Sequence, residues 1–131
     1  MEWASTLRHL YAALRPGGHL AFESRNPERR EWESWNREAT HERIDSLNGP
    51  MECWMDVVSV ADGRVHLLGH NVFIATGEVV VAESKLRFRT HAELTASLVA
   101  AGFIVEHLYG DWNHGPFIAE SRLMVFVARR N

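Results

Sequence analysis

The stretch Leu7–Ser24, which reads LRHLYAALRPGGHLAFES, decides the fold of this 131-residue chain. Apolar side chains recur at spacings of three and four in its first half, which predicts a helix over residues 1–15. Pro16 cannot continue that helix, and the pair Gly17-Gly18 can adopt the left-handed backbone that reverses the chain. The apolar run His19–Ser24 then has the length and character of a buried strand. Helix, tight turn and strand together form half of an α/β crossover unit.

Residues 39–88 are predicted to form an antiparallel β-meander. Asp62-Gly63 and Thr76-Gly77 are turn dipeptides flanked by strand-type sequence. Folding about the first turn places Trp54 opposite Asn71, Val58 opposite Leu67 and Val60 opposite Val65, and the second turn places Phe73 opposite Val80 and Asn71 opposite Ala82. A slip of one residue would exchange the two faces. In this register one face is apolar and holds Trp54, Val58, Val60, Val65, Leu67, Phe73, Val80, Ala82, Leu86 and Phe88. The other face mixes apolar side chains with charged ones, as a cavity wall or contact surface does: Cys53, Met55, Val57, Leu68, Val72, Ile74 and Val81 with His66, His70, Glu83, Lys85 and Arg87.

The flanking segments carry recognisable helix and strand signals. Asn26 is a suitable N-cap for a short helix from Pro27 to about Arg37, in which Trp32 and Trp35 share one face. The two tryptophans either attach a surface helix to the fold or belong to a lid that borders a substrate pocket. Residues 90–93, Thr-x-x-Glu, have the spacing of a capping box and predict a helix that ends at a glycine, residue 102. Strands are predicted at 103–109 and 122–129, antiparallel and joined by a loop rich in turn-forming residues.

The order of these motifs resembles class I S-adenosylmethionine-dependent methyltransferases. LRPGGHLAFES, followed by Arg25-Asn26-Pro27, is similar to the helix–PGG–strand segment late in their Rossmann-like fold. LRFRTHAEL, AGFIVEHLYGDW and RLMVFVARR resemble the segments that follow it. The resemblance implies a single α+β domain over residues 1–131, in which a truncated sheet of strands near 19–24, 103–109 and 122–129 carries flanking helices and the appended meander.

The resemblance covers the C-terminal, substrate-side part of such an enzyme. The family holds S-adenosylmethionine with a glycine-rich turn after its first strand and an acidic residue after its second, and neither has a counterpart in this sequence. The implied function is therefore binding of a small-molecule methyl acceptor, by a chain that is inactive on its own and does not bind the cofactor alone.

Composition excludes several other classes of function. A net charge of −3 gives no basic surface for nucleic acid. No apolar run approaches about 18 residues and no signal-peptide pattern is present, so no membrane segment or secretion is expected. Cys53 is the single cysteine, which fits a reducing cytoplasm. None of the eight histidines has helical His-x-x-x-His spacing, so no metal site is predicted.

Candidate site residues fall in three places. Residues 109–117 combine a carboxylate, a histidine and aromatic side chains in one loop, which suits a small-molecule site. The alternative is structural: Trp112 and Phe117 plug the end of the sheet, and Asp111 caps backbone amides. Arg25 and Asn26 follow a strand at the sheet edge where α/β proteins bind ligands, although a helix cap explains them equally well. His70 opposite Glu83 suggests a general base or a structural pair. No catalytic residue is assigned; the predicted substrate-binding residues are Arg25, Asn26, Trp32, Trp35, Trp54, His70, Tyr109, Asp111, Trp112, His114 and Phe117.

The sequence predicts two kinds of protein partner and leaves one alternative function open. The strand His19–Ser24 would have an exposed apolar edge, so a homodimer is predicted, through that edge or through the meander. A separate cofactor-binding chain is a further expected partner. The alternative from another class is a non-enzymatic ligand-binding or dimerisation module, with a pocket lined by Trp54, Met55, His70 and Trp112.

Overall fold

The computed structural model describes residues 2–131, which divide into two compact units. Unit 1 comprises residues 2–29 and 89–131; it contains α1 (Trp3–Ala13), β1 (His19–Arg25), the 3₁₀ turn η1 (Pro27–Arg29), α3 (His91–Ala100), β6 (Phe103–Tyr109) and β7 (Leu123–Arg130). Unit 2 comprises residues 30–88; it contains the 3₁₀ turn η2 (Glu31–Ser34), α2 (Arg37–Thr40), β2 (Glu42–Ser46), β3 (Gly49–Ala61), β4 (Arg64–Phe73) and β5 (Val79–Arg87).

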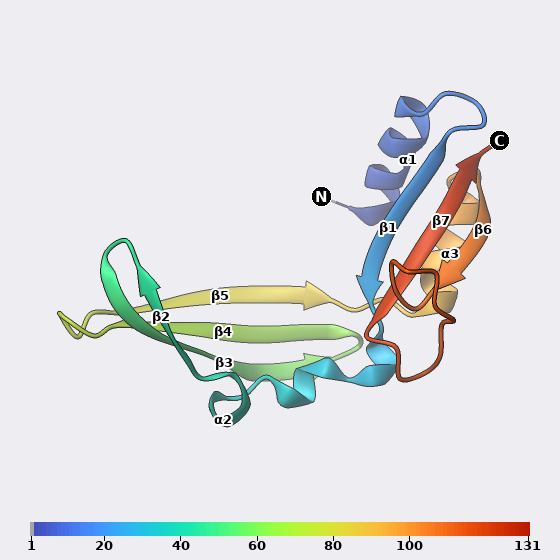
Figure 1. The fold of residues 1–131 in the computed structure, drawn as a ribbon. Helices are drawn as coiled ribbons and strands as arrows, with labels where there is room; N and C mark the ends of the chain where they lie inside the picture. The colour runs from blue at the N-terminus through green and yellow to red at the C-terminus, as the bar shows by residue number, and fades with distance from the viewer. Residues whose placement is uncertain (1) are drawn as a thin grey trace. The chain divides into compact units, whose positions relative to one another are not determined.

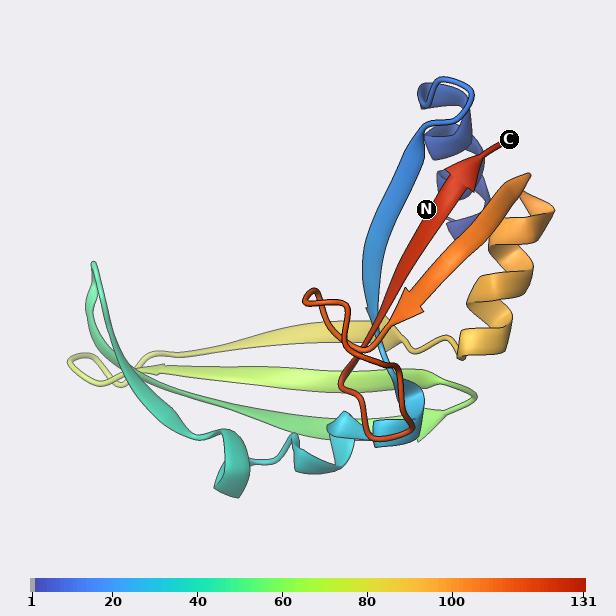
Figure 2. The same cartoon turned by 45° about the vertical axis from the view of Figure 1, so that its right-hand side comes forward.

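Unit 1 is an antiparallel sheet of order β1-β7-β6 with α1 and α3 packed on one side of it (Figures 1 and 2). Alternate residues of the central strand β7 face the helices, because side chains alternate along a strand. Phe126 is fully buried and stacks on Phe22 of β1 with ring centroids 5.4 Å apart. Leu7 of α1 and Leu98 of α3 are also fully buried in this cluster. The predicted strands and their antiparallel pairing are thus confirmed.

The turn that follows α1 has the conformation predicted from Pro16-Gly17-Gly18. Gly17 has a φ of +81°, and a side chain on Gly18 would place its Cβ 2.9 Å from the carbonyl oxygen of Arg15. Arg130, at the end of β7, donates from Nη1 to the carbonyl oxygens of Tyr11 and Leu14. The Tyr11 carbonyl also accepts from the backbone N–H of Leu14 at 3.3 Å, so the cation from the last strand adds to the hydrogen bonds at the end of the first helix.

The predicted capping box is present at the start of α3. The Thr90 hydroxyl accepts from the backbone N–H of Glu93, and the Glu93 carboxylate accepts from the backbone N–H of Thr90. Gly102, with a φ of +101°, ends the segment as expected. A Cβ at this position would lie 3.0 Å from the ring of Tyr11, which contacts Phe103 edge-on with ring centroids 5.2 Å apart.

Unit 2 is the predicted meander, an antiparallel sheet of order β2-β3-β4-β5 in which β3, β4 and β5 lie side by side (Figure 1). Asp62 and Gly63 have φ values of +51° and +74°, so the left-handed backbone that a two-residue hairpin requires falls on the predicted dipeptide. Val60 is paired with Val65, as predicted.

The predicted register of β3 is wrong at residue 58 and before it, because β3 contains a bulge. Val57 is paired with Leu67 and Ser59 with His66, which leaves Val58 as an extra residue. Upstream of the bulge every side chain of β3 therefore changes face, so that Trp54 lies opposite His70 rather than Asn71. Met55 and Val57 consequently face the core of unit 2, which contains Trp35, Val65, Leu67 and Phe88.

The predicted helix from Pro27 to Arg37 is also absent. Two short 3₁₀ turns, η1 and η2, replace it, and Arg30 between them has a left-handed φ of +51° that ends the first turn. The Asn26 side chain accepts from the backbone N–H of Glu28, which closes a local turn instead of capping a longer helix. No helix among residues 2–131 is long and apolar enough to cross a membrane.

An ionic group lies on the sheet of unit 1. The alternation of side chains along the strands places it on the face that points away from the helices. His19 Nε2 is 2.7 Å from Glu106 Oε1, and Arg129 Nε donates to Glu106 Oε2 at 3.2 Å. The hydrogen bond from His19 is the largest cause that lowers the pKa of Glu106 below its ordinary value of 4.5, and Arg129 adds to it. Desolvation opposes the shift.

The lowered pKa of Glu106 predicts a pH dependence of stability. The folded state favours the carboxylate, so its contribution is fully present above the ordinary pKa and is lost as the pH falls through the lowered value. We expect acid to lower the unfolding midpoint less steeply in Glu106→Gln than in the wild type. Thermal unfolding between neutral pH and pH values below 4.5 tests this, with the exposed Glu120→Gln as control. Identical profiles for wild type and Glu106→Gln would contradict the assignment.

Candidate functional site

Asn26 follows the carboxyl end of β1 and is buried, with 2% of its surface exposed. Its side-chain N–H groups donate to the backbone carbonyls of Ala119 and Ser121, both at 2.9 Å. Its oxygen accepts from the Glu28 backbone N–H within the local turn. The two donated hydrogen bonds hold the chain after β1 against the loop before β7. Asn26 therefore positions this edge of the sheet.

Asp111 organises the loop that joins β6 and β7. Its Oδ1 accepts from the backbone N–H groups of Asn113 and Gly115 at 2.8 and 2.9 Å. This arrangement allows His114 to adopt a φ of +63° and to stack on Tyr109, with ring centroids 4.5 Å apart. The carboxylate thus shapes the loop, which is the structural alternative considered from the sequence.

The remaining predicted residues of unit 1 differ in exposure. Phe117 is half-buried and packs against the core of unit 1, and its ring centroid lies 6.0 Å from that of His91. Trp112 is 51% exposed and does not plug the sheet. Arg25 and His114 are exposed. The accessible groups at this edge are therefore a cation, an imidazole and an indole, supported by buried Asn26.

Trp32 and Trp35 belong to the core of unit 2. Trp35 is 7% exposed, and both indoles pack on Phe88, with centroid distances of 4.8 Å from Trp32 and 6.0 Å from Trp35. The two tryptophans pin the segment before β2 to the sheet. Their contacts match the structural interpretation of this segment, and their predicted role in substrate binding stays a prediction.

Trp54 and His70 form the densest polar and aromatic group of unit 2. Their rings stack with centroids 5.0 Å apart and an interplanar angle of 12°. The guanidinium carbon of Arg37 lies 4.4 Å from the centroid of the Trp54 indole. His41 lies beside the same indole, with a centroid distance of 6.1 Å. The sequence analysis missed Arg37 and His41, because their contacts depend on the path of the chain around α2.

The predicted pair of His70 with Glu83 is wrong. His70 Nε2 lies 3.0 Å from Asp56 Oδ2, whereas Glu83 Oε1 lies 2.8 Å from His66 Nε2. The bulge at Val58 places Asp56 on the His70 face, and β4 and β5 pair two residues away from the predicted alignment. A general base in unit 2 would thus be an imidazole oriented by the Asp56 carboxylate.

Trp54 and Met55 do not line one pocket together. Trp54 stacks on His70, whereas Met55 packs against the core cluster of unit 2. Neighbouring residues of a strand point to opposite faces, so this separation follows from the strand itself. Among the described residues, no group of three His, Cys, Asp or Glu side chains is arranged to hold a metal ion.

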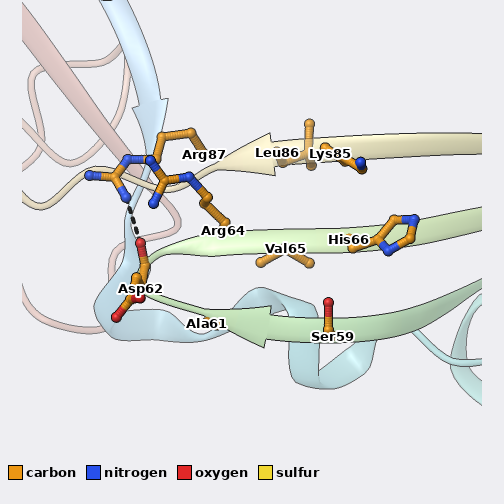
Figure 3. Close-up of a pocket in the computed structure, with 9 residues that line it drawn as sticks. All are labelled: Ser59, Ala61, Asp62, Arg64, Val65, His66, Lys85, Leu86 and Arg87. Atoms are coloured by element: carbon orange, nitrogen blue, oxygen red, sulfur yellow. Dashed lines mark hydrogen bonds between the residues drawn. The ribbon is translucent and has the colours of Figure 1, made fainter.

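Each unit also contains hollows that the predicted residues do not line. A hollow of about 540 Å³ lies on β3, β4 and β5 of unit 2 and is lined by Ser59, Ala61, Asp62, Arg64, Val65, His66, Lys85, Leu86 and Arg87 (Figure 3). In unit 1, a hollow of about 450 Å³ lies beside the Asn26 turn, lined by Glu28, Arg29, Ala119 and Glu120. An apolar hollow of about 230 Å³ lies at β1, with Trp3, Leu20 and Phe22 in its wall.

No protein-family model and no curated relative matches the chain. Solved structures do match it along 98% of its length. An S-adenosylmethionine-dependent methyltransferase from Clostridium acetobutylicum superimposes with a TM-score of 0.72 at 7% identity, over 50% of its own chain. A sugar N-methyltransferase from Streptoalloteichus gives 0.62 at 18% identity over 48% of its chain, and the methyltransferase CcbJ from Streptomyces caelestis gives 0.59 at 22% identity over 52%.

This chain has the fold of part of an S-adenosylmethionine-dependent methyltransferase. It spans about half the length of the methyltransferases that it matches. The predicted α+β architecture, with a three-stranded sheet, flanking helices and a meander, is confirmed as a methyltransferase-like arrangement.

Proposed function

We propose that the chain is the acceptor-binding, C-terminal part of a small-molecule methyltransferase that functions in the cytoplasm. The observation that carries the proposal is the match of nearly the whole chain to about half of solved methyltransferases, among them a sugar N-methyltransferase and an amino pentose methyltransferase. Methyl transfer from a sulfonium requires mainly that acceptor and methyl group be held in line. A protein part that binds the acceptor therefore contributes to rate without supplying a nucleophile.

Each unit by itself offers accessible predicted residues that could bind an acceptor. In unit 1 these are Arg25, Trp112 and His114, held by the contacts of Asn26 and Asp111. In unit 2 they are Trp54 and His70. The His70–Asp56 pair would accept the proton that an amine or hydroxyl acceptor loses on methylation.

Cofactor binding is proposed to come from another polypeptide segment, either in a longer chain or in a separately encoded partner. No glycine-rich turn leads from a strand into a helix in this sequence, and Gly17-Gly18 instead ends a helix. The chain alone is therefore expected to be inactive.

Titration of the isolated chain with S-adenosylhomocysteine tests this division. We expect no saturable heat in isothermal titration calorimetry, because no backbone cradle for the cofactor is formed by these residues. A complete enzyme, such as the sugar N-methyltransferase from Streptoalloteichus, serves as the positive control. Saturable binding of one ligand per chain would contradict the proposed division.

A homodimer is proposed for the isolated chain. Within the described residues, β1 has a strand neighbour on one side only, and β5 is likewise an edge strand. Val79, Val80 and Val81 of β5 are 56%, 44% and 50% exposed. Edge strands with apolar side chains favour pairing with another chain.

Sedimentation velocity measures the dimer directly. We expect a dimer at high micromolar concentration, and we expect a lysine on the edge strand that forms the interface to dissociate it. Val80→Lys tests β5 and Ala21→Lys tests β1, so each variant serves as the control for the other. A wild-type chain that remains monomeric throughout would contradict the proposal.

A second candidate function is ligand binding without methyl transfer, favoured by the Trp54–His70 stack beside Arg37. An aromatic face flanked by a cation suits a planar or sugar ligand. Binding of small aromatic compounds to the chain alone, abolished by Trp54→Ala, would support this function. Such binding needs no cofactor, whereas the methyltransferase proposal requires a cofactor-binding segment for activity.

A further inference from the structure

The strand β5 (Val79–Arg87) is a long and regular sheet edge. It occupies one end of the order β2-β3-β4-β5, and it pairs with β4 along its whole length without a bulge (Figure 1). All nine of its residues are exposed, and none is proline. Natural sheets protect an edge with a short strand, a bulge or a proline, because an unprotected edge pairs with other chains. β5 is therefore well suited to accept another strand.

The other edge strands among residues 2–131 are shorter or irregular. β1 has seven residues, every second of which is half-buried. β6 also has seven and contains a register shift between Val105 and His107, and β2 has only five. This comparison favours β5 over β1 as the interface of the proposed homodimer, on which the present inference rests.

The main-chain groups of alternate β5 residues point away from β4. Phe88, just after β5, donates its backbone N–H to the carbonyl oxygen of Gly63. The carbonyl oxygen of Val80 accepts from a side chain of β4, so the main-chain groups of the even-numbered residues face β4. Because this direction alternates along an antiparallel strand, the main-chain groups of Glu83 and Lys85 point to the open side. A strand added there forms its hydrogen bonds with the odd-numbered residues.

We propose that β5 pairs antiparallel with β5 of a second copy of this chain, about a two-fold axis at Ser84. This register places Glu83 of each copy opposite Lys85 of the other, so the axis generates two pairs of opposite charge. Opposite charges on directly paired residues stabilise an antiparallel sheet, and like charges destabilise it. Two copies joined in this way form one continuous sheet of eight strands, four from each copy.

Neighbouring registers lack this charge complementarity. The axis must lie at a residue rather than between two, because outward-pointing residues then face each other and can form hydrogen bonds. An axis at Glu83 places this carboxylate opposite its own copy, and an axis at Lys85 does the same with the ammonium group. An axis at Ala82 places Glu83 opposite Val81 and leaves no pair of opposite charge. Among these registers, charge complementarity therefore selects Ser84.

The charged groups at the axis also have contacts within one copy. Glu83 Oε1 lies 2.8 Å from His66 Nε2 and 3.9 Å from Lys85 Nζ of the same chain. The side chains of Glu83 and Lys85 are 57% and 77% exposed, so each has room for a second partner across the axis. The two copies together bring two carboxylates and two ammonium groups to the axis, and these charges balance. Arg87 lies at the end of the paired region, opposite Val81 of the second copy, and takes no part in this balance.

The other face of β5 is apolar beside the axis. Ala82 and Leu86 are exposed, and the register places Ala82 of each copy opposite Leu86 of the other. Leu86 is paired on β4 with Val65, which is buried in the core of unit 2, so the added strand extends this apolar face across the axis. Pairing through one strand edge buries little surface, so the dimer is weak and depends on concentration.

A disulfide at the axis tests the pairing directly. Cys53→Ser first removes the single native cysteine. Ser84→Cys then places two thiols in an opposed pair without main-chain hydrogen bonds, where the Cα atoms lie about 4.5 Å apart, within the range that a disulfide spans. Mild oxidation at high micromolar concentration is expected to convert most of this variant to a disulfide-linked dimer on a non-reducing gel.

Ala82→Cys in the same background is the matched control. It is an exposed residue of the same strand and the same face. In the proposed register the two copies of residue 82 lie roughly 13 Å apart along the strands, too far for a disulfide, so this variant should stay monomeric on the gel. Absence of the Ser84→Cys dimer, or equal dimer yields from the two variants, would overturn the proposal.

Exchange of the two charges tests the register without a new thiol. Lys85→Glu replaces both pairs of opposite charge with pairs of carboxylates, and it is expected to raise the dimer Kd about two- to thirtyfold in sedimentation experiments. Glu83→Lys combined with Lys85→Glu restores opposite charges across the axis and should return the Kd close to that of the wild type. Arg43→Glu changes the net charge equally at an exposed residue of β2, and should leave the Kd unaltered. An unchanged Kd in Lys85→Glu, or a folded double variant that dimerises no better than Lys85→Glu, would overturn the proposal.

These experiments separate the interface from the other proposals. A wild-type dimer whose Ser84→Cys variant forms no disulfide would overturn pairing through β5 and leave the homodimer itself intact. A wild-type chain that stays monomeric would overturn both. Neither result bears on acceptor or cofactor binding, which calorimetry measures independently.

Discussion

Replacing Phe88 with alanine is expected to unfold unit 2. Phe88 is 4% exposed and contacts both Trp32 and Trp35. Removal of a buried phenylalanine lowers the free energy of unfolding by about 3–5 kcal/mol, because burial is lost and a cavity remains. The core of unit 2 has four buried residues, Trp35, Val65, Leu67 and Phe88, so little else can compensate.

Urea unfolding followed by tryptophan fluorescence measures this effect, because Trp32 and Trp35 report on the environment of Phe88. Leu47→Ala is the matched control, since Leu47 is a large apolar residue of unit 2 that is fully exposed. Leu47→Ala should change the free energy of unfolding by no more than about 0.5 kcal/mol. A Phe88→Ala protein that keeps its wild-type stability would show that these contacts do not hold unit 2 together.

Asn26→Ala is expected to destabilise unit 1 by about 2–3 kcal/mol. The substitution removes three hydrogen bonds and leaves the carbonyls of Ala119 and Ser121 without their side-chain donor. Loss of a partner from a buried polar group costs about 1–3 kcal/mol per group. Asn26→Asp keeps the acceptor for the Glu28 backbone N–H and loses both donors. It should therefore recover only a small part of the free energy of unfolding that Asn26→Ala loses.

Thermal unfolding of the two variants measures this effect, and Asn113→Ala in the same loop is the control, because Asn113 is exposed. Wild-type stability in Asn26→Ala would contradict the positioning role of this residue. The prediction separates that role from direct contact with an acceptor, which would change binding and leave stability unaltered.

The parts of the fold that the sequence predicted correctly depend on local chemistry. Gly17 and Gly63 have the positive φ values that their turns need, and Thr90 and Glu93 form their capping box within four residues. These devices act between near neighbours, so the residue types alone reveal them. The antiparallel strands and the overall α+β architecture followed from the same signals and from the resemblance to methyltransferases.

The incorrect predictions depend on the backbone and on distant contacts. The bulge at Val58 has no glycine to indicate it, yet it moves Trp54 and Asp56 to the face of His70. The helix expected after Pro27 is replaced by two 3₁₀ turns, and Arg30 between them adopts a left-handed conformation. No local residue pattern distinguishes either feature from a regular strand or helix.

The sequence identified the residues of the candidate site better than it identified their roles. The loop after β6 was identified from its polar and aromatic residues, but the sequence left open whether Asp111 binds a ligand or backbone N–H groups. The role of Asn26 depends on carbonyls more than 90 residues away, at Ala119 and Ser121. Such long-range hydrogen bonds are set by the packed structure and have no signature in one sequence.

The most direct test of the central proposal is the mass of the native protein from its source cells, measured first under native conditions and then after denaturation. We predict that the native species includes a cofactor-binding segment, visible after denaturation either as one chain of about twice 15.0 kDa or as a second chain. A native species that consists only of the 131-residue chain would contradict the proposal that this part acts within a complete methyltransferase.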